Sequence, residues 1–363
     1  MVDAVYGDDA GRRAADAPSG CAGDDVAWLR TGSEFGLIGL HLAEHLGGQD
    51  QPFGVQAAVV SSLGRRLAPS PHLPVIAFAL PLLAHGTSSE QRDRLLPRVL
   101  AGEVVVAVAG LVPVGYGQQT GRLRIVDTTD GVVVDGAATD VIQAGDADLL
   151  LVVDGARVAC LNLDAPGLDV VPLETLDLTR QRFQVQADGV PGELLGSVDE
   201  ALIRRVVVQA TALAAADSVA GARACLDAAV EYATLRVQFD QPIGSFQAVQ
   251  HALADLFGEV VAAEASVAAA VEAVSTSDDP ASDDTALELA QIAKVAASEA
   301  FSRAARESIH LHGGIGFTWE HDAHLFYRRA LTDRPLLGDP TLHRRALARA
   351  FVAASAASRK ENS

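Results

Sequence analysis

The chain has 363 residues, 49% of them hydrophobic and 21% charged, and a formal net charge of −19. This length suffices for two or three domains with sizeable cores, and the acidic balance argues against a nucleic-acid surface or a basic membrane-binding face. No apolar run reaches the roughly 18 residues of a membrane span. The polar first 25 residues lack the apolar core of a signal peptide and predict a frayed start or one short helix, so we expect a cytoplasmic protein.

Helical patterns predict an N-terminal α-helical domain over residues 1–103. Apolar residues recur at helical spacing through residues 55–67, and three prolines then interrupt the pattern. Ser88, with Gln91 three residues later, is a capping-box signal that predicts a helix ending near Ala101.

Short β-branched runs, punctuated by glycine, aspartate and proline, predict a middle antiparallel β domain over residues 104–196, built as a small barrel or sandwich. The expected strands are Val104–Val108, Leu123–Val126, Val132–Val134, Leu149–Val153, Val158–Leu163 and Phe183–Ala187.

Residues 197–363 predict a C-terminal four-helix bundle, because long apolar-faced helices joined by short loops pack antiparallel. Ser197 is the expected N-cap of the first helix, which should end near Leu235. Further helices are expected after Pro242, from Asp284 or Thr285 to about His310, and over Pro340–Ala356. The fold class is therefore α+β multidomain, in the order helices, sheet, helices.

Two segments carry the chemistry of a phosphate-binding site. The first runs from Arg236 to Gln247 and the second from His310 to Gly316. Arginine offers a planar fork for phosphate oxygens, and paired glycines let backbone N–H groups approach them closely. The alternative to a binding role is that Arg236 forms a surface ion pair and Gly313-Gly314 a helix C-cap turn. The candidate cofactor-binding residues are Arg236, Gln238, Phe239, Gln247, His310, Gly313 and Gly314.

No metal site is expected. The three cysteines, Cys21, Cys160 and Cys225, are too sparse and are read as buried small hydrophobic residues in a reducing compartment. A histidine group near residues 312–324 has no cysteine or second acidic cluster beside it.

In this order and at this separation, the two segments resemble the acyl-CoA dehydrogenase family. The resemblance covers nearly the whole chain and is nearest to the actinobacterial members that act on CoA thioesters of steroid side chains. It extends to Glu34–Leu40 with Gly47-Gly48, to Leu63–Pro69, and to Leu95-Leu96-Pro97. It implies an FAD cofactor, an acyl-CoA substrate that undergoes α,β-dehydrogenation, and an electron-transfer flavoprotein as acceptor.

The resemblance also places the catalytic carboxylate at one of two positions, and neither holds one. Leu337 stands at the position in the loop after the glycine pair, and Ala210 stands at the position 26 residues before Arg236. Nearby acids are Asp339 and Asp217, the latter two helical turns after Ala210. Unless one of them is a base, both are expected to face solvent or another subunit.

The residues that face the flavin ring in this family are replaced by others in this sequence. In the run 136–144, Asp140 replaces the aromatic residue that shields the flavin, and Ile142 replaces the threonine that bonds its N5 edge. The segment Val108–Tyr116 lacks the family's Thr-Glu-Pro loop. In family dimers, residues at the positions of the two conserved segments reach across and hold the FAD of the neighbouring subunit.

The two conserved segments, together with the replaced base and flavin-facing residues, lead to one hypothesis and two alternatives. The hypothesis is a hetero-oligomer, α2β2 with half the usual FAD, in which this chain lends cofactor contacts to an intact acyl-CoA dehydrogenase subunit. The first alternative is a self-sufficient flavoenzyme with Asp217 or Asp339 as base. The second is a non-catalytic scaffold of the same fold.

Overall fold

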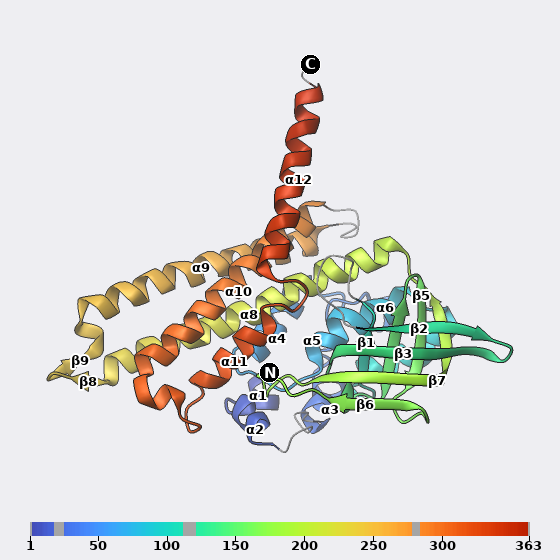
Figure 1. The fold of residues 1–363 in the computed structure, drawn as a ribbon, viewed down its shortest axis with the longest axis horizontal. Coiled ribbons are helices and arrows are strands. Elements are labelled where there is room, and N and C mark those ends of the chain that lie inside the picture. Colours follow the sequence, from blue (N-terminus) through green and yellow to red (C-terminus); the bar gives the residue numbers. More distant parts are fainter. Residues whose placement is uncertain (1, 18–24, 112–120, 278–283, 362–363) are drawn as a thin grey trace.

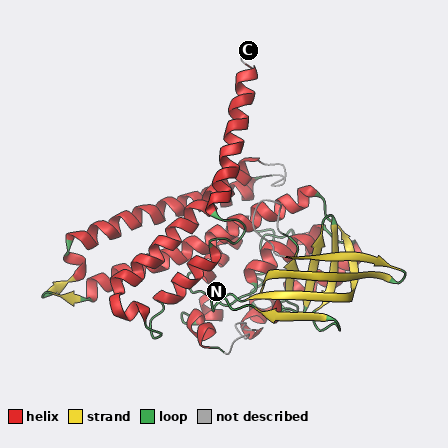
Figure 2. Ribbon diagram, viewed as in Figure 1, coloured by secondary structure: helices red, strands yellow, loops and turns green. Residues whose placement is uncertain are grey.

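The computed structural model describes residues 2–17, 25–111, 121–277 and 284–361. Helices at the N-terminal end, a curled sheet and a set of long helices follow one another along the chain (Figure 1). The strands of the curled sheet gather at one end of the molecule, a short hairpin lies at the opposite end, and long helices extend between the two (Figure 2). The fold class expected from the sequence is confirmed.

The N-terminal part is helical throughout. Ser88 caps α7 with the expected capping box, since its hydroxyl accepts from the Gln91 backbone N–H. The first residues are more ordered than the sequence suggested, because Tyr6 and Ala10 are buried. The helices are α1 (Val2–Tyr6), α2 (Ala10–Asp16), α3 (Asp25–Ser33), η1 (Glu44–Leu46), α4 (Phe53–Gly64), α5 (His72–Pro74), η2 (Val75–Ala79), α6 (Leu80–His85) and α7 (Ser89–Leu100).

A seven-stranded sheet follows, in the order β1-β4-β5-β7-β3-β2, with β6 paired to β7. Its pairs are antiparallel except β1 with β4, which run parallel, so the expectation of a purely antiparallel sheet was wrong at that edge. The pattern also missed β6. The strands are β1 (Val106–Ala109), β2 (Gly121–Thr128), β3 (Gly131–Ile142), β4 (Leu149–Asp154), β5 (Arg157–Asn162), β6 (Leu168–Pro172) and β7 (Arg182–Ser197).

The C-terminal part is built on α8, a single helix of 36 residues. Its N-cap is Asp199, whose carboxylate accepts from the Leu202 N–H, and not Ser197, which ends β7. The pattern did not predict α11. The elements are α8 (Glu200–Leu235), β8 (Val237–Gln238), β9 (Gln241–Pro242), η4 (Ile243–Ser245), α9 (Gln247–Thr276), α10 (Asp284–His312), η5 (Gly313–Phe317), α11 (Ala323–Asp333) and α12 (Pro340–Glu361).

Helices α8, α9 and α10 pack side by side, while most of α12 projects away from the body (Figure 1). Small residues allow close approach of the long helices: a Cβ on Gly221 of α8 would lie 2.5 Å from the Phe301 ring of α10. Among the described helices, none is long and apolar enough to cross a bilayer. Cys160 and Cys225 are free and buried as expected, and Cys21 lies outside the described residues.

Candidate functional site

The two candidate cofactor-binding segments meet at one end of the helical part. Arg236 directly follows α8, and His312 ends α10. The rings of Tyr232 and His312 pack with centroids 4.3 Å apart, which joins the two helix ends. In Figure 1 the β8–β9 hairpin lies at the opposite end of the molecule from the sheet. We call this surface, residues 236–247 with 310–314, the bundle end.

Side chains of the bundle end are open to solvent. Arg236, Gln238, Gln247 and His310 are exposed, and Phe239 is 88% exposed. Within the described part of the chain, the Arg236 guanidinium has no ion-pair partner. The expected alternative for Arg236, a surface ion pair, is therefore not what the described residues form.

The glycine pair has the geometry of a close-approach site. Gly313 has φ +63°, a left-handed conformation that a side chain would strain. A Cβ at Gly313 or Gly314 would meet no atom within 4 Å, so the space beside both is open. A cavity of about 830 Å³ adjoins them, lined by His310, Gly313 and residues of α10 and α11. The lining is Leu176, Arg306, Ile309, His310, Gly313, Phe317, Trp319, His324, Tyr327, Arg328 and Leu331.

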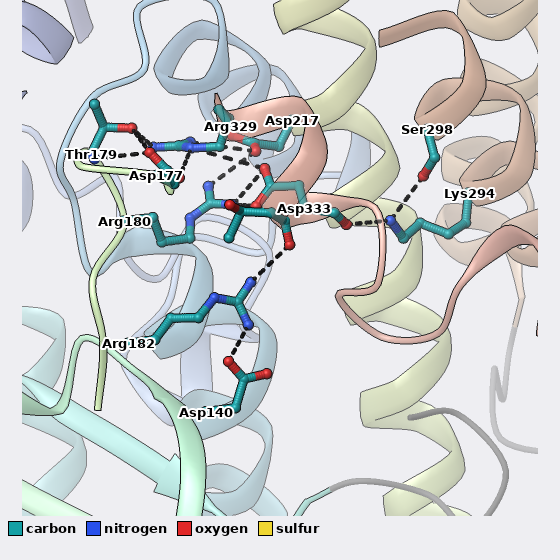
Figure 3. A network of polar contacts seen from close by, with 11 residues as sticks. Asp140, Asp177, Thr179, Arg180, Arg182, Asp217, Lys294, Ser298, Arg329 and Asp333 are labelled. Atoms are coloured by element: carbon teal, nitrogen blue, oxygen red, sulfur yellow. Dashed lines mark hydrogen bonds and ion pairs between the residues drawn. The ribbon is translucent and has the colours of Figure 1, made fainter. Parts of the chain in front are cut away.

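A buried ionic network joins the sheet to the helices (Figure 3). Arg180 Nη1 donates to both carboxylate oxygens of Asp333, at 2.8 and 2.9 Å, and its Nη2 donates to Asp217 at 3.0 Å. Arg329 on α11 donates through Nε to Asp177 at 2.5 Å. Every one of these side chains is at most 7% exposed, so each charge depends on its partner in place of water.

Lys294 of α10 is fully buried at the edge of this network. Its ammonium donates to Ser298 Oγ and to the Asp333 carbonyl oxygen, both at 2.9 Å. Burial lowers the Lys294 pKa to about 8, although Asp333 and Asp217 act in the opposite direction. The sequence patterns missed the network because its contacts join residues 37 to 153 positions apart, from different elements. The Arg329–Asp333 spacing of four residues was its one local sign.

Two family models match this chain. The model of the acyl-CoA dehydrogenase C-terminal domain matches residues 203–352, and that of the N-terminal domain matches residues 13–103. Acyl-CoA dehydrogenase IpdE2 of Mycobacterium tuberculosis is 34% identical over 321 residues, 87% of this chain and 84% of IpdE2.

The chain belongs to the acyl-CoA dehydrogenase family.

Solved structures agree with this assignment. A variant of the Tcur3481-Tcur3483 steroid ACAD superposes with a TM-score of 0.82 at 28% identity, covering 98% of this chain and 96% of that one. The ChsE4-ChsE5 complex from Mycobacterium tuberculosis superposes with a TM-score of 0.83 at 27% identity, covering 97% of this chain and 94% of that one. The second of these structures is named as a complex of ChsE4 with ChsE5.

The two positions at which the resemblance led us to expect a catalytic carboxylate hold Ala210 and Leu337. Ala210 is fully buried in α8. Leu337 follows α11 with φ +58°, packs against the main core, and accepts a hydrogen bond at its carbonyl from His343 Nε2 at 3.0 Å. Burial lowers the His343 pKa to about 4, so this ring is neutral near pH 7.

The two nearby acids are both held in structural contacts. Asp339 accepts from the Thr341 N–H at 2.7 Å near the start of α12, and this bond lowers its pKa. From the sequence we expected Asp217 to face solvent or another subunit unless it acts as a base, and the expectation of an outward-facing side chain was wrong. Asp217 is 4% exposed and pairs with Arg180. Burial raises the Asp217 pKa against the opposing charges of Arg180 and Arg329.

Of the two residues expected from the resemblance to stand at flavin-facing positions, Asp140 forms a local ion pair. Asp140 has φ +68° at an irregularity in β3 and pairs with Arg182 at 2.7 Å. Arg182 also donates to the Thr332 carbonyl at the end of α11. Ile142 is buried and presents no hydroxyl. Of the segment Val108–Tyr116, residues 112–116 lie outside the described residues.

Proposed function

We propose that this chain is the non-catalytic subunit of an FAD-dependent acyl-CoA dehydrogenase. It lends the bundle end to a cofactor whose flavin ring and catalytic base belong to an intact partner subunit. The proposal rests on a contrast between two sets of residues. The bundle end has solvent-exposed groups that can bind phosphate, whereas both expected base positions lack a carboxylate.

The residues of the bundle end fit the phosphate and adenosine part of FAD. Arg236 offers a charged fork without a competing partner among the described residues. Gly313 and Gly314 leave backbone groups accessible, and His310 opens onto the adjoining cavity. When bound, FAD supplies the hydride acceptor of the family's reaction. Here this chain's part is to bind and orient the cofactor.

The residues at the flavin-facing positions do not fit the ring. Asp140 puts an anion where the family has an aromatic wall, and its pairing with Arg182 gives it a structural partner. A carboxylate beside a reduced, anionic flavin is unfavourable. The site of this subunit's own flavin is therefore proposed to be idle.

The length of α8 supports the proposal that this chain contributes its bundle end to the cofactor site of a neighbouring subunit. Its 36 residues span about 54 Å at 1.5 Å per residue, and they separate the end of β7 from Arg236. A dinucleotide held at Arg236 is too short to lie along α8 to the β7 end of this chain's sheet. A neighbouring subunit can bring its own sheet to the bundle end.

The substrate we propose is the CoA thioester of a bulky acyl group, such as a steroid side chain, with an electron-transfer flavoprotein as acceptor. Similarity to the Tcur3481-Tcur3483 steroid ACAD and to the ChsE4-ChsE5 complex supports both the substrate class and the two-gene assembly. A scaffold that has lost FAD would have no need for the open chemistry of the bundle end.

The test is the flavin content of the purified protein. The chain is purified alone and together with the product of an adjacent acyl-CoA dehydrogenase gene, and flavin absorbance is measured per polypeptide. We expect little flavin in the chain alone and half a flavin per polypeptide in the complex. Full flavin in the chain alone, with turnover of an acyl-CoA, would overturn the proposal in favour of the self-sufficient enzyme.

A further inference from the structure

Helix α12 leaves the body of the molecule as an arm, which we define as residues 345–361 (Figure 1). Its base is fixed in place, because His343 is fully buried and Arg344 pairs with a glutamate of α10. Farther along, Phe351 is 75% exposed and Val352 is 65% exposed. A helix of about four turns without neighbours is only marginally stable in water, so the arm is expected to pack against another molecule.

The exposed side of the arm combines positive charge with apolar side chains. Over residues 340–355, α12 has three arginines and no acidic residue, in a chain whose net charge is −19. Arg345 and Arg349 are exposed and have no ion-pair partner among the residues that the structure describes. Their spacing of four residues, followed by three to Val352, places these side chains on one side of the helix. The arm therefore offers a basic, partly apolar stripe to another molecule.

The outer side of α9 has matching chemistry. Phe257 and Val261, one helical turn apart, are 53% and 39% exposed. In Figure 1, α9 borders the helical part on the side from which the arm projects. We call Phe257 and Val261, with Asp255 and Glu272, the α9 face. Small residues occupy further exposed positions beside them, so a second helix can approach closely. These are Ala254, Gly258, Ala262, Ala265, Ala268 and Ala269.

The α9 face carries the opposite charge to the arm. Helix α9 has four acidic residues and no lysine or arginine. Two of these acids pair with arginines of α8 and α10, whereas Asp255 and Glu272 are exposed and have no ion-pair partner within the described ranges. Arg223 of α8, whose guanidinium lies 5.5 Å from the Phe257 ring centroid, is one of the paired arginines. Unpaired carboxylates on α9 thus correspond to unpaired guanidinium groups on the arm.

We propose that the arm of one molecule packs on the α9 face of a second copy of this chain. The apolar side chains of the two surfaces are then removed from water, and the unpaired arginines come into range of the unpaired acids. Two copies related by a twofold axis exchange arms, so the same contact forms twice and the assembly closes as a dimer. Both halves of the contact belong to one sequence, so no other partner is required. This dimer does not depend on the function proposed for the bundle end.

The experiment measures the mass of the full-length chain, purified alone, by light scattering after gel filtration. The parent is expected to have twice the mass of one chain. The arm variant, Arg345→Glu with Arg349→Glu, and the face variant, Asp255→Arg with Glu272→Arg, each place like charges against one another. Each is expected to raise the dissociation constant of the dimer at least tenfold. An equimolar mixture of the two variants should restore the dimer, because both contacts of the mixed pair then join opposite charges.

The control variant carries Arg98→Glu and Arg124→Glu, at exposed positions on α7 and β2. It changes the net charge as much as the arm variant does, and it should dimerise as the parent does. All the substituted side chains are exposed, so circular dichroism should show an unchanged fold. The proposal is wrong if the parent is monomeric up to about 100 μM, where even a weak specific pair associates. It is also wrong if the arm variant dimerises as the parent does, or if the mixture of variants stays monomeric.

The complex with the intact partner subunit separates this dimer from the function proposed above. The arm variant should leave the flavin content of that complex unchanged per polypeptide, whereas Arg236→Ala should empty the complex of flavin and leave the chain alone dimeric. If the parent is monomeric alone and the arm variant fails to bind the intact subunit, the arm contacts that subunit, and the proposal of a second copy is overturned.

Discussion

Arg180 and Asp333 form a buried ion pair between positions 153 residues apart in the sequence. Arg180 lies just before β7 and Asp333 ends α11, so the pair fastens the sheet to the helices. Asp217 of α8 shares the same guanidinium. Arg180 thus neutralises two carboxylates in a region closed to water, with Arg329 within 4.0 Å of both as a second cation.

Arg180→Met should therefore be strongly destabilising. It leaves Asp217 and Asp333 buried with one neutralising partner fewer, which costs about 3–5 kcal/mol of unfolding free energy for a broken buried pair. Urea denaturation followed by circular dichroism measures the change. As control, Arg65→Met breaks a pair whose two side chains are 46% and 45% exposed and should cost under about 1 kcal/mol. Equal losses in the two variants would contradict a special role for the network.

Because the pKa of His72 is lowered by burial, we expect the free energy of unfolding to decrease at mildly acid pH. The folded-state pKa of His72, about 3, lies below the unfolded value of 6.5, so the folded state binds fewer protons than the unfolded state. The stabilising contribution is complete above pH 6.5 and is lost as pH falls toward 3. Between pH 7 and pH 5 this amounts to about 2 kcal/mol.

The measurement is urea unfolding at pH 7 and pH 5, for the parent and for His72→Gln. The variant should lose about 2 kcal/mol less over this interval, because the titrating group is gone and other contributions cancel in the difference. His251→Asn, an exposed histidine on α9, should behave as the parent. An unchanged pH dependence in His72→Gln would show that the ring is solvated in solution.

Arg236→Ala should empty the cofactor site of the complex without harming the fold. The side chain is exposed and has no ion-pair partner among the described residues, so the melting temperature should stay within about 1 °C. Flavin absorbance of the co-purified complex should fall to under about a tenth of the parent value, since a charge-assisted phosphate contact is lost. Arg124→Ala, exposed on β2, serves as control. Retention of flavin in Arg236→Ala would place the cofactor elsewhere.

Asp339→Asn separates the hetero-oligomer from the single-chain enzyme. Asparagine can still accept from the Thr341 N–H, so stability should change little. In the hetero-oligomer, the acyl-CoA turnover of the complex should stay within about twofold, measured by reduction of an artificial electron acceptor. Abolished turnover, with folding intact, would identify Asp339 as a base.

The sequence was sufficient to predict what local patterns encode. Periodicity and capping chemistry placed α7 and the end of α8, where Ser88 and Leu235 stand as expected. The end of β7 and start of α8 misled the pattern, because Ser197 and Asp199 are both good caps and the strand continues to Ser197. β6 was missed because its five residues alternate weakly and are mostly exposed.

The candidate site was likewise predicted only in part. Composition of the two segments and their spacing were enough to propose the bundle end, and the structure brings their helices together through Tyr232 and His312. The environment of Asp217 could not be predicted, because its partner Arg180 comes from a loop of the sheet region.

Because α8 is unbroken, the number of residues in it fixes how groups along its length are oriented around the helix axis. Asp217 lies within α8 and Arg236 is the residue directly after its end, so the helix fixes the direction around its axis at which the chain leaves toward Arg236. One residue inserted between them would turn Arg236 by about 100° and advance it by about 1.5 Å relative to the buried network. The number of residues between the two positions thus sets the direction in which the chain presents its cofactor contacts to a neighbouring subunit.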